Sequence, residues 1–284
     1  MHLVYTRHLP STLATMHTVL SVLAALLYAV GAGLPSRYGP AIAALTVAGW
    51  LLHGGALGED MLGPDSLRLG FAVMLSATLW ISVAAYWLEN RNLSLDGLRV
   101  LVLPCAAIAV LLPLLFPGAR VPLEGRSVWF SWHVLIAVLA YSTLTIAAFH
   151  AVLMAFQESR LHTPPAAARR NWLALTIDRL PALLTMERLL FRLIGFGFLL
   201  LTLTVVSGVL FSEQVFGAPF RLDHKTAFTM LSWLLFGILL LGRTWRGWRG
   251  KTALRFTLTG FATLLLAYVG TRFVLEVVLQ RGGM

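Results

Sequence analysis

The sequence predicts an all-α polytopic membrane protein built as a bundle of about eight transmembrane helices. Of its 284 residues, 58% are hydrophobic and only 12% are charged, and the mean hydropathy is +0.80. A soluble domain carries roughly 25% charged residues. A spanning helix needs about 20 mostly apolar residues, because hydrocarbon cannot satisfy an unpaired backbone group. Eight segments meet this requirement, at about 14–34, 39–58, 67–88, 97–116, 132–155, 192–212, 226–242 and 254–278.

The first segment follows a polar start that includes Arg7 and has to be distinguished from a signal peptide. Its apolar run is longer than that of a typical signal peptide, and seven more spans follow it, so we interpret it as a transmembrane helix.

The single cysteine, Cys105, lies inside the fourth segment. One cysteine excludes an intrachain disulfide and a cysteine-rich metal site. No segment between the spans is large enough to fold alone, so residues 1–284 are interpreted as one transmembrane domain.

The basic residues that produce the net charge of +10 lie between the spans, which disfavours nucleic acid as a partner. Lys and Arg accumulate in cytoplasmic loops. The 156–191 loop is rich in arginine, and the 243–255 segment has basic residues and no acid. Two spans separate them, so both fit the cytoplasmic side and both termini are predicted outside. Glu59, Asp60 and Asp65 then fall in an outer loop.

Three histidines are predicted on the outer half: His53 near the end of the second span, His133 at the start of the fifth, and His224 before the seventh. Ionisable groups inside membranes are costly and usually functional. Neutral imidazole is the ordinary axial ligand of haem iron. We therefore expect haem binding, with His133 and His53 as iron ligands. His224 is the alternative to His53 as the second ligand. Taken singly, each histidine also fits an interfacial residue, and His224, beside Lys225, fits a solvated loop.

The surroundings of His133 match the needs of a porphyrin. On the fifth helix, His133 and Tyr141 are spaced to share one face. Arg126 and Arg221 would pair with the propionates. Aromatic residues expected at this face are Trp129, Phe130, Trp132, Phe211, Phe216 and Phe220. An aromatic belt at the membrane interface explains Trp129 and Trp132 equally well.

Four groups of residues occur in order over about 125–270. The first group is Trp132, His133 and Val134, followed by Ala140, Tyr141 and Ser142. The second group is Met186, Glu187 and Arg188, followed by the 192–198 run and by Leu201, Thr202, Ser207 and Gly208. The third group is Asp223, Lys225, Ser232 and Trp233, and the fourth is the 246–251 turn. This ordered set resembles the CcsA/ResC cytochrome c assembly proteins. In length and eight-span layout the chain is similar to the small YpjD/HemX branch. The resemblance implies an assembly-like core at about 67–280, outward-facing haem binding and His133 as an iron ligand.

The chain also departs from the CcsA/ResC pattern. The tryptophan-rich loop of that family is reduced to Phe211, Phe216 and Phe220, and Leu241 stands where the family has a membrane histidine. The second external histidine of the family has no counterpart around 269–280. The resemblance therefore implies an accessory protein and not a complete haem-exporting synthetase.

The sequence thus predicts a haem-handling accessory protein of the inner membrane, not itself an enzyme, whose partners are haem, the lipid bilayer and other cytochrome assembly proteins. The alternative is a HemX-like regulator or scaffold of tetrapyrrole biosynthesis that acts through the 156–191 loop. A transporter is disfavoured because the spans contain almost no paired acids and bases and no inverted repeat is visible. An enzyme built on the acidic 59–65 loop is disfavoured because solvation explains those carboxylates.

Overall fold

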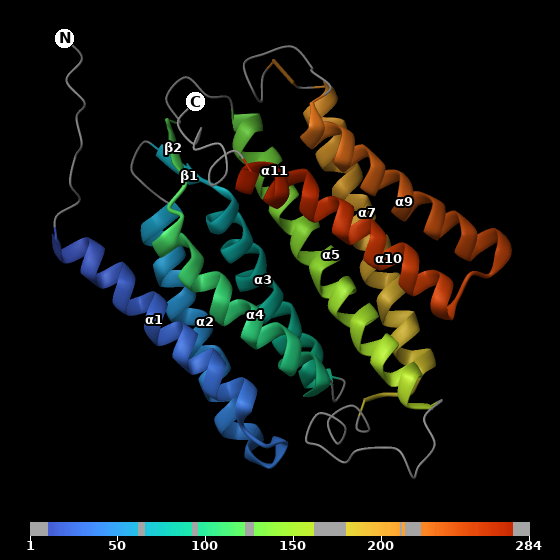
Figure 1. Cartoon of the computed structure of the whole chain (residues 1–284), viewed down its shortest axis with the longest axis horizontal. Coiled ribbons are helices and arrows are strands. Elements are labelled where there is room, and N and C mark those ends of the chain that lie inside the picture. The colour runs from blue at the N-terminus through green and yellow to red at the C-terminus, as the bar shows by residue number, and fades with distance from the viewer. Residues whose placement is uncertain are drawn as a thin grey trace.

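The computed structural model describes residues 11–61, 66–92, 96–122, 128–161, 180–210, 212–213 and 223–274. Within these residues, eight helices are long and apolar enough to cross a membrane, which confirms the predicted fold class (Figure 1). The helices are α1 (Ser11–Gly33), α2 (Gly39–Met61), α3 (Phe71–Asn92), α4 (Asp96–Leu115), α5 (Val128–Leu161), α7 (Leu183–Leu210), α9 (His224–Arg246) and α10 (Gly250–Leu265). A 3₁₀ turn, η1 (Ser36–Tyr38), precedes α2, and α10 continues through a π turn, η3 (Leu266–Gly270), into α11 (Thr271–Phe273).

The helices form two halves that lie side by side in Figure 1. In the first half, α1 packs against α2 and α4, and α3 packs against α4. In the second half, α5 packs against α7 and α10, and α9 packs against α10. The seam between the halves is formed mainly by α3 and α5. One continuous apolar core crosses the seam, because buried residues such as Leu103, Leu144 and Phe236 belong to the same cluster.

Both the outer surface of the helix bundle and its interior are suited to a lipid bilayer. Large apolar side chains remain exposed on the outside, among them Leu51, Ile108 and Leu199. Lipid tails cover such side chains at no cost, since they are as apolar as leucine. Inside, several buried hydroxyls are satisfied within their own helix: Thr46 donates to the Ile42 carbonyl at 2.8 Å, and Ser82 donates to the Thr78 carbonyl at 2.9 Å.

A small antiparallel sheet, which the sequence pattern did not predict, joins two of the connections. β1 (Ser66–Leu69) pairs with β2 (Ala119–Pro122). Gly118 enters β2 with φ of +71°, and a Cβ there would lie only 2.6 Å from the Leu69 carbonyl oxygen, so only glycine fits. The pairing places the α2–α3 and α4–α5 connections at one end of the bundle, as the predicted alternation of loops requires.

The opposite end, which we call the basic end, carries Arg160, Arg243, Arg246 and Lys251. Glu187 Oε1 there accepts hydrogen bonds from Arg243 Nη1 at 2.7 Å and from Arg249 Nε at 2.8 Å. Arg243 Nη1 also donates to the Trp248 carbonyl at 3.3 Å. These contacts tie the α9–α10 turn to α7. That the basic end faces the cytoplasm, with both termini outside, stays a prediction from charge.

The connection between α5 and α7 is shorter than the predicted 156–191 loop. α5 continues to Leu161 and α7 already begins at Leu183. Glu187 is therefore a buried helical residue and not part of a loop. Its burial is possible because Arg243 and Arg249 neutralise the carboxylate. The centre of the basic loop, 162–179, lies outside the described residues.

Candidate functional site

His133 lies in the second turn of α5 and is held against α7. Its Nδ1 is 2.8 Å from the Ser207 hydroxyl oxygen. The Ser207 hydroxyl oxygen also lies 3.1 Å from the Thr204 carbonyl oxygen. A serine proton directed to that carbonyl leaves the Ser207 oxygen to accept from His133 Nδ1–H, and the lone pair of the ring is then on Nε2. The ring also lies against Gly208, where a Cβ would come within 3.4 Å of His133 Cε1.

Two tyrosines and a lysine accompany His133 on the neighbouring elements. Tyr141, two turns further along α5, donates from its hydroxyl to the Leu264 carbonyl at 3.2 Å. Its ring meets Tyr268 of η3 edge to face, with centroids 6.3 Å apart. Lys225 of α9 places Nζ 5.3 Å from the centre of the Tyr268 ring, and its charge also acts on the His133 ring.

The site thus combines α5, α7, α9 and η3 at the end of the bundle opposite the basic end. A π turn such as η3 widens the helix and is frequent at functional sites. The Thr271 N–H accordingly bonds the Leu266 carbonyl, five residues back. The arrangement offers an oriented neutral imidazole, aromatic walls and one cation.

The structure describes only some of the other residues that the sequence predicted at this end of the bundle. His224 is the first residue of α9 and is exposed. Arg126 and Arg221, like Phe211, Phe216 and Phe220, lie outside the described residues. Trp129 and Trp132 are 53% and 54% exposed, as an aromatic belt would require. Phe130, in contrast, is buried.

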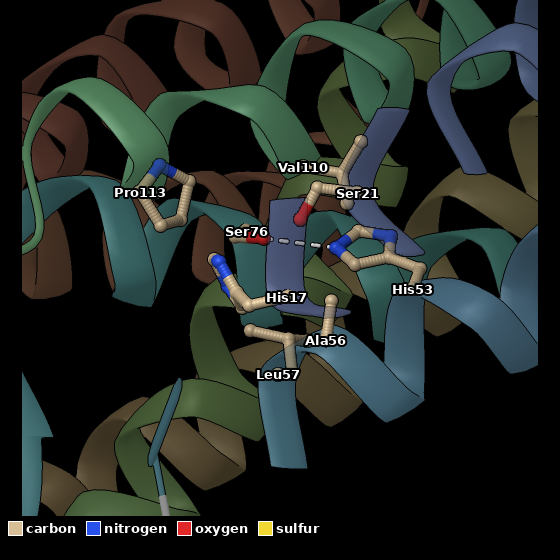
Figure 2. Close-up of a pocket in the computed structure, with 8 residues that line it drawn as sticks. All are labelled: His17, Ser21, His53, Ala56, Leu57, Ser76, Val110 and Pro113. Atoms are coloured by element: carbon tan, nitrogen blue, oxygen red, sulfur yellow. Dashed lines mark hydrogen bonds between the residues drawn. The ribbon is translucent and has the colours of Figure 1, made fainter. Parts of the chain in front are cut away.

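His53 lies in the first half, enclosed by its own set of neighbours. Its Nε2 is 2.8 Å from the Ser76 hydroxyl oxygen, and its Nδ1 is 3.4 Å from the Tyr28 hydroxyl oxygen. Figure 2 shows His53 in a small pocket to which α1, α2, α3 and α4 all contribute. The pocket is lined by His17, Ser21, His53, Ala56, Leu57, Ser76, Val110 and Pro113.

A pair of tryptophans fixes α2 to α3 one turn from this histidine. The Trp50 and Trp80 rings stack 4.9 Å apart at an interplanar angle of 4°. Each indole N–H donates to the other residue's carbonyl oxygen, at 3.1 Å from Trp50 and 2.9 Å from Trp80. A Cβ at Gly54 would meet the Trp80 ring at 3.0 Å, so the glycine beside His53 serves this close packing.

The structure does not bring His53 and His133 together. α3 packs against both α2 and α5, whereas α2 and α5 share no extended contact among the described residues (Figure 1). The hydrogen-bond partners described for the two rings belong to different halves. An iron shared by both histidines stays a prediction that requires His53 to leave Ser76 and Tyr28.

Sequence reasoning did not assign three members of the site: Ser207, Lys225 and Tyr268. Ser207 and Lys225 were among the residues that carried the family resemblance, so the signal was present but was not connected to His133. Tyr268 carried no signal, because a π turn has no simple sequence pattern.

A family model described as "Cytochrome C assembly protein" matches residues 61–279. The chain belongs to the cytochrome c assembly protein family. All described members of the His133 site fall within the matched residues, whereas His53 lies before them. The family places the chain in cytochrome c biogenesis.

Three relatives support this assignment. The inner membrane protein YpjD of Escherichia coli strain K12 is 30% identical over 146 residues, which cover 51% of this chain and 52% of that protein. The cytochrome c biogenesis protein CcsA of Thermosynechococcus vestitus is 26% identical over 183 residues, 52% of this chain and 56% of that protein. An uncharacterized 28.8 kDa protein of Azospirillum brasilense is 29% identical over 213 residues, 72% of this chain and 76% of that protein.

The chain spans about half the length of the YpjD and CcsA proteins that it matches. These matches confirm the predicted superfamily and its YpjD branch, and they support a multi-pass protein of the inner-membrane type. The HemX part of the resemblance stays a prediction.

Proposed function

We propose that this protein is a haem-handling accessory of cytochrome c assembly, in which His133 ligates the haem iron on the outer side of the inner membrane. The observation that carries the proposal is the contact of His133 Nδ1 with the Ser207 hydroxyl at 2.8 Å. If Ser207 accepts the Nδ1 proton, Nε2 is left as the metal-binding nitrogen. A second-shell acceptor of this type is the usual device that orients a metal-ligating histidine.

The residues around His133 fit a porphyrin by their chemistry. Gly208 allows the His133 ring to lie close to α7, Tyr268 would contribute an aromatic wall, and Lys225 would provide a cation for a propionate. When bound, haem would supply the iron that His133 ligates. Arg126 and Arg221 remain candidates for the second propionate. Unlike an enzyme, the site needs only to bind and orient its cargo.

We infer that His224, ahead of His53, would be the second residue to hold the iron. His224 is adjacent to Lys225, whose charge acts on the His133 ring, and it is exposed. His53 is completely buried and hydrogen-bonded at both nitrogens in the first half. Less rearrangement is therefore needed for His224 to reach an iron at His133.

The test is a titration of the purified full-length protein, in detergent, with ferric haem. We expect a Soret band that weakens strongly in His133→Ala and persists in His17→Ala, a matched change of a half-exposed histidine in the first half. A wild-type protein without a Soret band, or a His133→Ala protein with an unchanged one, would exclude the proposal. If replacement of the 162–179 loop abolishes cellular function while His133→Ala does not, the regulatory alternative is selected.

A further inference from the structure

Buried polar atoms that lack a hydrogen bond gather at the basic end of the seam. Among the described residues, six side-chain atoms are of this kind, and Ser21 Oγ is the one that lies elsewhere. The other five are Glu89 Oε2, Arg99 Nε, Arg99 Nη1, His150 Nε2 and Gln157 Oε1. Buried polar atoms are nearly always paired, and ionisable residues inside spans are usually functional. This concentration therefore requires an explanation.

The four residues belong to one corner of the bundle. Glu89 is in the last turn of α3, Arg99 is in the first turn of α4, and His150 and Gln157 are two turns apart on α5. The segment before α7 closes this corner. Gln157 Nε2 donates to the Pro181 carbonyl at 3.1 Å, and Leu180 packs directly on Gly97 at the start of α4.

The hydrogen bonds of His150 determine where its protons lie. Its Nδ1 is 3.0 Å from the Ile146 carbonyl oxygen, which can only accept, so Nδ1 carries a proton. Its Nε2 is 3.4 Å from Glu89 Oε2. In a neutral ring this Nε2 would have only a lone pair, and an ionised carboxylate has only acceptors. Two buried acceptors facing each other are unfavourable unless a proton lies between them.

We propose that Glu89 and His150 form a proton-binding site, which holds one exchangeable proton between Glu89 Oε2 and His150 Nε2. The proton is carried either as a carboxylic acid that donates to Nε2 or as an imidazolium that donates to the carboxylate. Both forms contain the same number of protons, and the pair is neutral in each. Release of the proton to water leaves an ionised Glu89 and a neutral ring, with a net change of one negative charge.

The proton reaches the pair through Glu89. The side chain of Glu89 is 19% exposed, whereas that of His150 is 0% exposed. Because Glu89 belongs to the first half and His150 to the second, the proton also bridges the seam. Separation of the halves at this corner would hydrate the carboxyl group and favour release, so proton binding and seam closure are coupled.

Charged groups with described partners surround this corner, and Arg99 is a buried cation within it. At this end of the bundle Glu187 is bound by Arg243 and Arg249, Glu158 is 4.0 Å from Lys251, and Arg91 lies over the Trp87 ring. Arg99 is 1% exposed, and its Nε and Nη1 have no hydrogen-bond partner. Burial of the carboxyl group favours its protonated form, and the 19% exposure of Glu89 gives the proton a route to water.

Infrared spectroscopy of the full-length protein in lipid nanodiscs tests the proposal, with Glu89→Gln against the matched control Glu158→Gln. If the proton resides on the carboxyl group, the carbonyl stretch of a protonated acid at neutral pH is lost in Glu89→Gln and kept in Glu158→Gln. If it resides on the ring, ¹⁵N-histidine NMR shows one doubly protonated imidazole, which is lost in His150→Gln.

An ionised Glu89 together with a singly protonated His150 at neutral pH would overturn the proposal. The wild-type spectra alone decide this point if a variant does not fold. Total absence of a protonated carboxyl band and of any doubly protonated histidine is incompatible with a shared proton.

Discussion

The two halves of the bundle use their histidines in different ways, although His53 and His133 lie near the same end. In the first half, His53 is completely buried, and both ring nitrogens are engaged by Tyr28 and Ser76. In the second half, Ser207 anchors Nδ1 of a half-buried His133, with a lysine and a π turn close by. Depth in the bundle does not by itself distinguish the two histidines. Under the proposed function His133 would ligate iron through Nε2, whereas His53 would first have to leave both Tyr28 and Ser76.

Among the variants that test the difference between the two halves, Trp80→Ala is expected to have the largest effect, which is a loss of stability. The change removes a stacked ring and the hydrogen bond from Trp80 Nε1 to the Trp50 carbonyl, both of which join α2 to α3. Truncation of a tryptophan in a packed interior costs about 3–5 kcal/mol. We expect a large loss of stability measured by chemical denaturation in detergent. Haem binding of the protein that remains folded should be nearly unchanged, because the His133 site lies in the second half.

Phe273→Ala is a matched control for Trp80→Ala, because Phe273 is also aromatic but is 41% exposed. Its loss of stability should be much smaller. A Trp80→Ala protein that folds normally but loses its Soret band would show that the halves share one haem site, and it would restore His53 as a ligand.

A smaller effect is expected from Ser207→Ala, which removes the acceptor that sets the tautomer of His133. Loss of such a second-shell partner lowers metal affinity by about 10–100-fold. Equilibrium titration with haem should show this weakening, with the number of binding sites unchanged. Thr202→Ala is the control, since it removes another α7 hydroxyl, whose described partners are Trp233 Nε1 at 2.9 Å and the Phe198 carbonyl at 2.7 Å. Equal affinities for Ser207→Ala and wild type would contradict the assigned role of Ser207.

The parts of this comparison that could be predicted from the sequence are those encoded locally. Each span is an apolar run, so all eight helices were predicted, and the depth of His53 and His133 followed from their positions in those runs. The packing of one helix against another, in contrast, does not follow from these local apolar runs. No local pattern indicates that α3 separates α2 from α5, so the expectation of a shared cavity for the two histidines had no direct support.

The errors in the fold have a common physical cause, which is pairing between distant residues. Glu187 was assigned to a loop because a carboxylate is costly in a span, but Arg243 and Arg249 neutralise it from 56 and 62 residues away. β1 was not predicted because its four residues are stable only when they pair with β2. The corner formed by Glu89, Arg99 and His150 was missed for the same reason, since it joins three helices.

The smallest effect concerns Asp223, which caps α9 just before Lys225 and so holds that end of the second half. Its carboxylate accepts from the Thr226 N–H at 2.7 Å. Burial raises the pKa of this carboxyl, but hydrogen bonds from Thr226 and the charge of Lys225 more than offset that effect and hold the pKa below its usual value. The stabilisation is therefore present above the ordinary aspartate pKa and is lost as the pH falls through the lowered one.

Asp223→Ala should cost about 1 kcal/mol of stability at pH 7, the usual value of an N-cap. Asp223→Asn keeps an acceptor for the Thr226 N–H and should retain most of the cap, without its pH dependence. Denaturation of the three proteins at neutral and acidic pH measures both differences. The Asp223→Ala deficit should shrink in acid, because the wild-type cap becomes protonated there. If the deficit is independent of pH, the cap acts through its shape and not through its charge, and the Lys225 end of the site is held by packing alone.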